Sequence, residues 1–118
     1  MSDERTATTL LSLALVAGCL ATKAAAANPS PPVEHALRTA AAVHGVPYPE
    51  LRAVSWCESR WNPRAIGTVA RGLFQFLPTT FARTPYARRS ILDPLANALA
   101  TAWLVVQDGG WLEWDCQP

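Results

Sequence analysis

The apolar positions of this chain recur at helical spacing over most of its length. From Ser30, its expected N-cap, to His44, the pattern predicts a helix with prolines in its first turn that ends before Gly45. A second helix is predicted from near Pro49 to Glu58. No stretch shows the strict alternation of a half-buried strand. The pattern therefore predicts a mainly all-α domain.

The clearest helix start lies late in the chain, where Asp93 is the expected N-cap and Pro94 the first helical residue. This helix is predicted to run to about Gln107 and is apolar on nearly every side. Such a helix is either buried or spans a membrane, and this one is too short to span. We expect it to be the buried central helix of a compact, lysozyme-like bundle, with a short helix at 78–83 and at most a β stub at 72–76.

The segment 1–27 carries the pattern of a cleaved export signal. An apolar run, Leu10–Ala17, is followed by the small residues Ala24–Ala27, and the run is too short for a membrane-spanning helix. The proline-rich residues 28–32 then form a predicted linker, and the domain covers 33–118. We therefore expect a secreted, periplasmic or cell-wall-associated protein; the alternative is a disordered apolar tail on a cytosolic protein.

The three cysteines fit this organisation. Cleavage near Ala27 removes Cys19, whereas the lipobox-like sequence that ends at Cys19 would instead make this residue a lipid anchor. Both routes leave the pair Cys57 and Cys116. In an oxidising compartment we expect this pair to form a disulfide, and the alternative is two buried free thiols.

Length and charge narrow the function classes. A chain of 118 residues is one domain, and we expect it to be a monomer. Its net charge is +1, with Lys23 as the only lysine and scattered arginines, so a nucleic-acid surface is not expected. His35 and His44 have no ligand partners nearby in the sequence, and no phosphate-binding loop is present. We therefore expect neither a metal nor a cofactor.

Glu58 is the first candidate for chemistry. It lies in the last turn of a predicted helix that is otherwise mostly apolar. The helix dipole and burial both disfavour its ionised form, which raises proton affinity as a general acid requires. Arg60 would act in the opposite direction if it turned inward. The alternative is a solvated glutamate at a frayed helix end.

Several short motifs occur in order around and after Glu58. They are Glu58-Ser59, Asn62-Pro63-Arg64-Ala65, Gly72-Leu73-Phe74-Gln75 with the following Pro78-Thr79-Thr80, and Asn97 on the late helix. This series strongly resembles the soluble lytic transglycosylase family and its goose-type lysozyme relatives. The resemblance covers about 33–106. Small secreted members of the family have a cysteine beside the glutamate that pairs with one near the C-terminus, as Cys57 and Cys116 would here.

The resemblance implies roles for individual residues. Glu58 would protonate the glycosidic oxygen between N-acetylmuramic acid and N-acetylglucosamine in peptidoglycan. Gln75 would hydrogen-bond substrate near the cleaved bond, and Gly72 would permit close approach of the backbone there. Asn97 would orient Glu58 or the N-acetyl group of the sugar; the alternative is a buried structural amide.

The chain departs from the family pattern at two positions. The family usually has a serine where this chain has Gly67, and its hydroxyl helps to position the acid. The family also often has Tyr-Leu where this chain has Trp103-Leu104. An indole N–H can still donate a hydrogen bond to the carboxylate of Glu58, so we retain Trp103 as a candidate.

Aromatic side chains supply further candidates because sugar rings stack on them. Phe76, beside Gln75, and Tyr86, in a predicted loop, are the expected glycan contacts. Most other aromatic residues are expected in the core, as is usual. The expected core members are Trp56, Trp111 and Phe81.

The sequence offers no convincing second carboxylate, although glycosidases usually need two. The family manages with one: the muramoyl 6-hydroxyl attacks, leaving a 1,6-anhydro end, while Glu58 acts as acid and then as base. Hydrolysis, with a carboxylate such as Asp93 holding water, is one alternative. A non-catalytic glycan-binding or partner-docking module is another, and a fragment of a larger wall-lysis assembly is a third.

Overall fold

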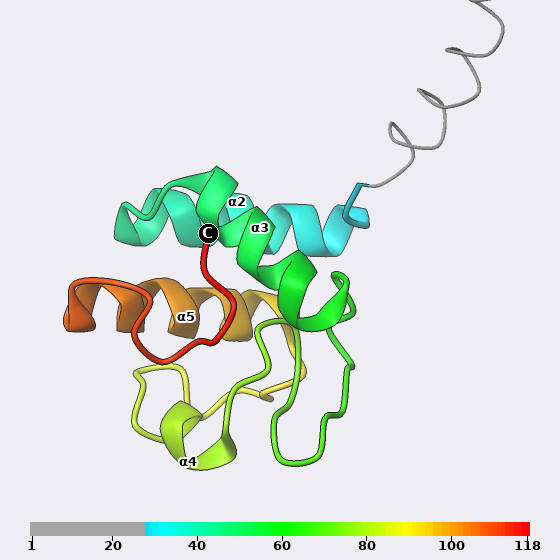
Figure 1. Ribbon diagram of the computed structural model, residues 1–118, viewed down its shortest axis with the longest axis vertical. Coiled ribbons are helices and arrows are strands. Elements are labelled where there is room, and N and C mark those ends of the chain that lie inside the picture. Colours follow the sequence, from blue (N-terminus) through cyan, green and yellow to red (C-terminus); the bar gives the residue numbers. More distant parts are fainter. Residues whose placement is uncertain (1–27) are drawn as a thin grey trace, which may run out of the picture.

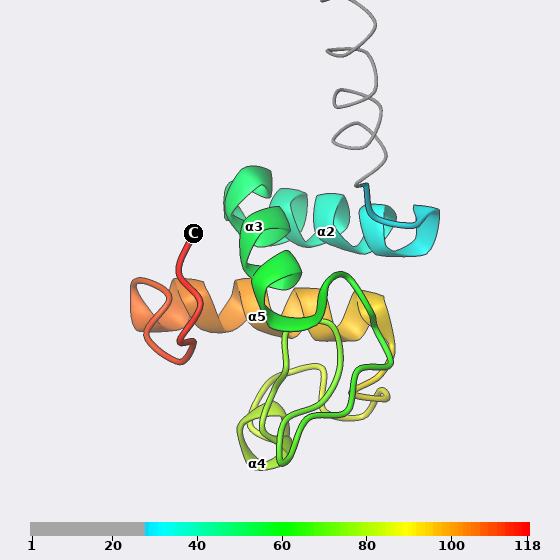
Figure 2. The ribbon, with the colours of Figure 1, turned by 45° about the vertical axis from the view of Figure 1, so that its right-hand side comes forward.

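The computed structural model of the chain describes residues 28–118, and the segment 1–27 with Cys19 lies outside the described residues. The described part is all-α and contains no strand, which confirms the expected fold class. In Figures 1 and 2, α5 lies in the middle, with α2 and α3 on one side and α4 with the long loops on the other. The helices are α2 (Pro31–His44), α3 (Tyr48–Ser59), α4 (Pro78–Phe81) and α5 (Pro94–Asp108).

Helix α5 is the buried centre of the domain, as predicted. The Asp93 side chain accepts a hydrogen bond from the backbone N–H of Ala96, and Gly109 ends the helix in the left-handed conformation with φ of 73°. Residues 96–102 are all buried. Alanine is frequent in the facing surfaces of α2 and α5, and its small side chain lets the two helices pack closely.

The N-terminal boundary of the fold lies earlier than the predicted linker allows. Pro31 and Pro32 belong to the first turn of α2, as predicted for a helix capped by Ser30, so this helix includes residues that were also assigned to the linker 28–32. Proline suits this turn because its missing N–H has no helical partner there. Ser30 is the N-cap, but its side chain makes no capping hydrogen bond.

Helix α3 ends at Ser59, so Glu58 lies in its last turn, as expected. The turn is closed by Arg60, whose backbone N–H donates to the carbonyl of Trp56 over 2.9 Å. Arg60 and Trp61 have φ values of 55° and 61°, outside the helical region. The helix therefore ends one residue after Glu58, its predicted last residue.

The loop after α3 forms isolated β-bridges in place of the β stub considered at 72–76. Arg71 bridges Ile66 on one side and Phe76 on the other. These contacts fold residues 65–76 back on themselves. The segment Leu73–Phe76 is thereby carried under the end of α3.

Candidate active site

Glu58 lies on the inward face of α3 and is half-buried. It follows Val54 by four residues and Ser55 by three, and both of those side chains are fully buried. Residues at this spacing share one helix face. Glu58 therefore points toward the interior at the point where the helix ends and the core opens.

The surroundings of Glu58 favour its protonated form. Burial, the strongest influence, raises the pKa of its carboxyl above the ordinary value of 4.5. The backbone N–H of Cys116 faces the carboxylate and lowers the pKa, while the negative charge of Asp115 raises it. The net direction is upward, which suits a group that must donate a proton near neutral pH.

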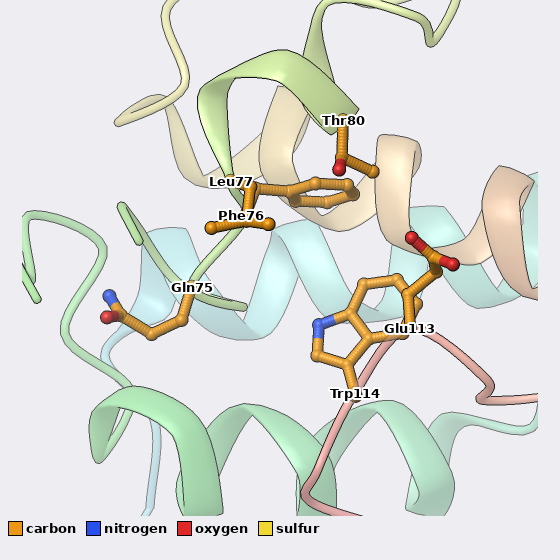
Figure 3. A pocket seen from close by; sticks show the side chains of 6 residues that line it. All are labelled: Gln75, Phe76, Leu77, Thr80, Glu113 and Trp114. Carbon is orange, nitrogen blue, oxygen red and sulfur yellow. The ribbon is translucent and has the colours of Figure 1, made fainter. Parts of the chain in front are cut away.

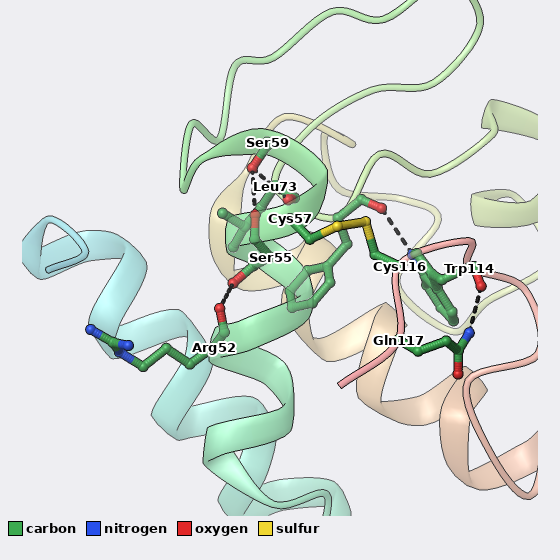
Figure 4. The surroundings of a disulfide bond; sticks show 9 residues. Arg52, Ser55, Cys57, Ser59, Leu73, Trp114, Cys116 and Gln117 are labelled. Carbon is green, nitrogen blue, oxygen red and sulfur yellow. Dashed lines mark hydrogen bonds between the residues drawn. A yellow bond between two sulfur atoms is a disulfide. The ribbon is translucent and has the colours of Figure 1, made fainter. Parts of the chain in front are cut away.

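The expected disulfide between Cys57 and Cys116 is present, with Cα atoms 6.0 Å apart (Figure 4). It joins the residue before Glu58 to the C-terminal tail, which we define as residues 110–118. The tail turns back from the end of α5 toward α3 (Figure 1). The Trp114 indole anchors it by donating a 2.9 Å hydrogen bond to the carbonyl of Phe74. The bridge thus fixes the tail against the end of α3 that carries Glu58.

Ser59 holds the loop segment Leu73–Phe76 against the same helix end. Its hydroxyl lies 2.7 Å from the carbonyl of Leu73 and 3.2 Å from that of Ser55. Sequence reasoning noted Ser59 only as part of the Glu-Ser motif and assigned it no contact. The serine fixes the position of this segment relative to Glu58.

Asn97 does not contact Glu58, contrary to the role implied by the resemblance. Its side chain has no exposed surface. Its oxygen accepts the backbone N–H of Phe74 over 2.8 Å, and its nitrogen donates to the carbonyls of Ile91 and Arg71 over 2.8 and 3.5 Å. These contacts are those of a buried structural amide, because three backbone groups use its hydrogen-bonding capacity, and a role toward the N-acetyl group stays a prediction.

Gly72 serves the same internal junction. It is buried, with φ of 83°. A Cβ at this position would lie 2.5 Å from both the Asn97 side-chain nitrogen and the Ile91 carbonyl oxygen. The close approach that requires glycine in this structure is therefore between Gly72 and these two residues, and a contact of Gly72 with substrate stays a prediction.

Phe76 and Tyr86 are both held by other residues. Phe76 is only 2 % exposed, and its ring packs edge-on against Phe81 and Trp114, so a sugar cannot stack on its face. The hydroxyl of Tyr86 lies 2.7 Å from Nε2 of His44 at the end of α2. That contact fixes the loop that carries Tyr86, and no contact within the described residues joins Tyr86 to Glu58.

The burial of the tryptophan side chains differs from the prediction. Trp111 is buried as expected, but Trp56 is 39 % exposed and lies against Trp61 with ring centroids 4.6 Å apart. Trp103 is half-buried on α5. Within residues 28–118 no hydrogen bond joins its indole to Glu58, so the expected donor to the carboxylate is not observed.

A small pocket lies between the tail and the start of α4 (Figure 3). Its volume is about 40 Å³, and Glu58 is not among its lining residues. The tail connects the two places, because Trp114 lines the pocket and the backbone N–H of Cys116 faces the Glu58 carboxylate. The lining residues are Gln75, Phe76, Leu77, Thr80, Glu113 and Trp114.

A family comparison now bears on these observations. The model of the Transglycosylase SLT domain matches residues 35–107 of the chain. The chain belongs to this family. The corresponding comparisons with curated proteins and with solved structures gave no match. The SLT match ends at residue 107, so the tail that carries Trp114 and Cys116 lies beyond it.

Gln75 spans the loop of this SLT domain. Its φ is 53°, and its side-chain nitrogen donates to the carbonyls of Ala65 and Gly72 over 3.2 and 3.0 Å. Its side chain points away from Glu113 and Trp114 in Figure 3. The amide nitrogen is therefore occupied within the loop, and a role toward substrate remains a proposal for the amide oxygen.

Gly67, where the family usually has serine, is explained by Gln75. A Cβ at position 67 would lie 2.5 Å from the Gln75 side-chain oxygen. We expect Gly67→Ser to displace Gln75 and to destabilise the domain by about 1–3 kcal/mol, the usual cost of overpacking. Thermal unfolding of this variant beside Thr68→Ser, an exposed neighbour, measures the effect. Equal melting temperatures for the two variants would contradict it.

Other carboxylates of the SLT domain are differently placed. Asp93 caps α5 and pairs with Arg89 over 2.9 Å, so its carboxylate is engaged and poorly suited to hold a water at Glu58. Asp115 is exposed but close enough to influence Glu58. Across residues 28–118, no group of three potential metal ligands lies together, and no helix has the length and apolar character to cross a membrane.

Proposed function

We propose that this SLT domain cleaves the glycan strands of peptidoglycan, with Glu58 as general acid. The observation that carries the proposal is the half-buried Glu58 carboxyl, whose pKa burial raises. It sits at a helix end fixed by the Ser59 contact and by the Cys57–Cys116 disulfide. Membership of the transglycosylase SLT domain family supports the substrate class.

The cleaved bond would be the β-1,4 linkage between N-acetylmuramic acid and N-acetylglucosamine. Glu58 donates its proton to the glycosidic oxygen, and the bond from that oxygen to the muramoyl C1 breaks. The ionised Glu58 then accepts the proton of the muramoyl 6-hydroxyl, and the oxygen of that hydroxyl bonds to C1. The products are a 1,6-anhydromuramoyl end and a free 4-hydroxyl, with no water consumed.

Hydrolysis is a second candidate, and Asp115 is the observation that favours it. Its negative charge is near enough to raise the pKa of Glu58, so the site has a second carboxylate that sequence reasoning placed only in the tail. Glycosidases commonly use such a pair, one as acid and one to activate water. The lytic route remains our first proposal because the family is named for it.

Product masses distinguish the two routes. The purified protein is incubated with peptidoglycan sacculi, and the released muropeptides are analysed by mass spectrometry. Muropeptides that lack one water relative to hydrolysis products support the lytic route. Fully hydrated ends support the hydrolytic route, and an absence of released muropeptides contradicts cleavage itself.

Asp115 also provides a prediction on pH dependence. Its charge raises the pKa of Glu58, so Asp115→Asn should lower that pKa. The protonated form of Glu58 would then be lost at lower pH, and the alkaline limb of the rate profile should move to lower pH. Asp115→Glu, which keeps the charge, should move it little. An alkaline limb at the same pH in Asp115→Asn and wild type would refute this influence.

We further propose that the protein acts outside the cytoplasm. The disulfide is typical of oxidising compartments, and peptidoglycan lies there. The export-signal pattern of the segment 1–27 agrees with this location. Mass spectrometry of the mature N-terminus distinguishes cleavage near Ala27 from lipidation at Cys19.

A further inference from the structure

The tail beyond the SLT match contributes one wall of the small pocket at the start of α4. Residues 110–118 follow the last matched position, 107, yet Glu113 and Trp114 line the pocket together with Thr80 and other residues around the start of α4. This wall is fixed rather than loose. Trp114 is 7 % exposed and bonded to the Phe74 carbonyl, and the disulfide fastens the tail two residues further on.

Glu113 gives this pocket its only charged group. No lysine, arginine or histidine lines the pocket. Within residues 28–118, no hydrogen bond or ion pair engages the Glu113 carboxylate. In Figure 3 the carboxylate points toward Thr80 and the ring of Phe76, at the mouth of the pocket. A carboxylate with no compensating charge, beside a hydroxyl and apolar ring edges, favours a ligand with a cationic donor.

The pocket is connected to the site of the proposed chemistry by two segments of the chain. One wall, the segment 73–76, is held under the end of α3 by the hydrogen bond between Ser59 and Leu73. The other wall, the tail, reaches Glu58 through the backbone N–H of Cys116. A glycan placed with a linkage at Glu58 would therefore extend toward Glu113.

We propose that Glu113 is a specificity-determining residue that favours an ammonium group on the substrate. This inference rests on the proposed function, because it takes the ligand to be part of peptidoglycan. Two sources there supply the same chemistry: the free amine of a glucosamine whose acetyl group has been removed, and the side-chain amine of a diamino acid in the stem peptide. Stem-peptide carboxylates would be repelled at the same position.

Binding measurements test the proposal independently of turnover. Affinities are measured by titration calorimetry for two pairs of soluble probes. The first pair is a chitotriose with free amines and its fully N-acetylated form, and the second is a stem tripeptide with its diamino-acid side chain free or acetylated. Each pair is measured with wild type, Glu113→Gln, Glu113→Asp and, as a matched control on α3 that does not line the pocket, Glu50→Gln.

The expected result concerns the free-to-acetylated ratio, which is the affinity for the free-amine probe divided by the affinity for its acetylated form. This ratio should change within one of the two pairs. Glu113→Gln should lower the free-to-acetylated ratio about threefold, a modest effect because Glu113 is exposed. Glu113→Asp and Glu50→Gln should retain the wild-type ratio, and high salt should reduce it. The pair that responds identifies the source of the ammonium. Ratios that are equal in wild type and Glu113→Gln for both pairs overturn the proposal, whereas a failure of cleavage with a responsive ratio overturns only the proposed catalysis.

Discussion

Glu58→Gln is expected to reduce glycan cleavage by about 10²–10⁴-fold, the usual contribution of a general acid, while glycan binding persists. Glutamine keeps the shape and hydrogen-bonding capacity of the side chain but has no proton to give to a leaving oxygen. Release of muropeptides from sacculi measures turnover, and co-sedimentation with sacculi measures binding.

Glu50→Gln is the matched control for this substitution because Glu50 lies on the same helix. Its carboxylate accepts a 2.9 Å hydrogen bond from the Trp111 indole, and glutamine can still accept it. Wild-type turnover is expected in this control. Cleavage by Glu58→Gln at the wild-type rate would remove Glu58 from the mechanism, and binding without cleavage by the wild type would indicate a non-catalytic glycan-binding module.

The stability of Glu58→Gln separates lost chemistry from lost folding. The pKa of Glu58 is higher in the folded chain than its ordinary value, so ionisation costs stability as the pH rises above about 4.5. Glutamine avoids this cost. At neutral pH we therefore expect Glu58→Gln to unfold at a temperature no lower than that of the wild type.

Loss of the Cys57–Cys116 disulfide is expected to have the largest effect on stability. The bridge closes a loop with a sequence separation of 59, which contributes about 4 kcal/mol in the chain-entropy model. For a domain of this size the corresponding fall in melting temperature is roughly 15–30 °C. Thermal unfolding of the double variant Cys57→Ser/Cys116→Ser, beside the wild type, measures it.

Reductant provides the control for the disulfide. The wild type should melt at a lower temperature in reductant, whereas the melting temperature of the double variant should be the same with and without reductant. Turnover below the melting temperature should also fall in both reduced and serine forms, because the tail that contacts Glu58 is no longer fastened. A wild type whose melting temperature is the same with and without reductant would contradict the stabilising role of the bridge.

The helices were predictable because their signals are local. The Asp93-Pro94 start and the glycines after α2 and α5 act within one helical turn, and the apolar surface of α5 indicated its central position. The end of α3 was predicted at Glu58, one residue before its observed end at Ser59. The left-handed conformation of Arg60 and Trp61 that follows is not signalled by either residue type in a sequence.

The contacts of Asn97 were beyond local reasoning. Its partners at 71, 74 and 91 come from two loops, and only the folded chain brings those loops to one point of α5. The same junction explains Gly72, whose glycine is required by the close approach of Asn97. The family motif indicates which residues are needed. It does not indicate whether a residue is needed for the fold or for contact with substrate.

Tail carboxylates were set aside for a similar reason. In the sequence Asp115 is far from Glu58, and only the disulfide indicated that the two regions meet. Once that pairing is accepted, Asp115 and Glu58 each adjoin one of the bridged cysteines. Its position next to a cysteine of the predicted disulfide was thus the signal that could have identified Asp115. The position of Glu113 in the pocket depends instead on the turn between Trp111 and Trp114.

The most direct test of the central claim is a carbon-13 NMR titration of the Glu58 side-chain carboxyl in the wild-type protein, assigned by comparison with Glu58→Gln. The account predicts a midpoint above the ordinary value of 4.5, because the half-buried carboxyl retains its proton. A midpoint at or below 4.5 would contradict it, since such a carboxylate is ionised well below neutral pH and is a poor general acid.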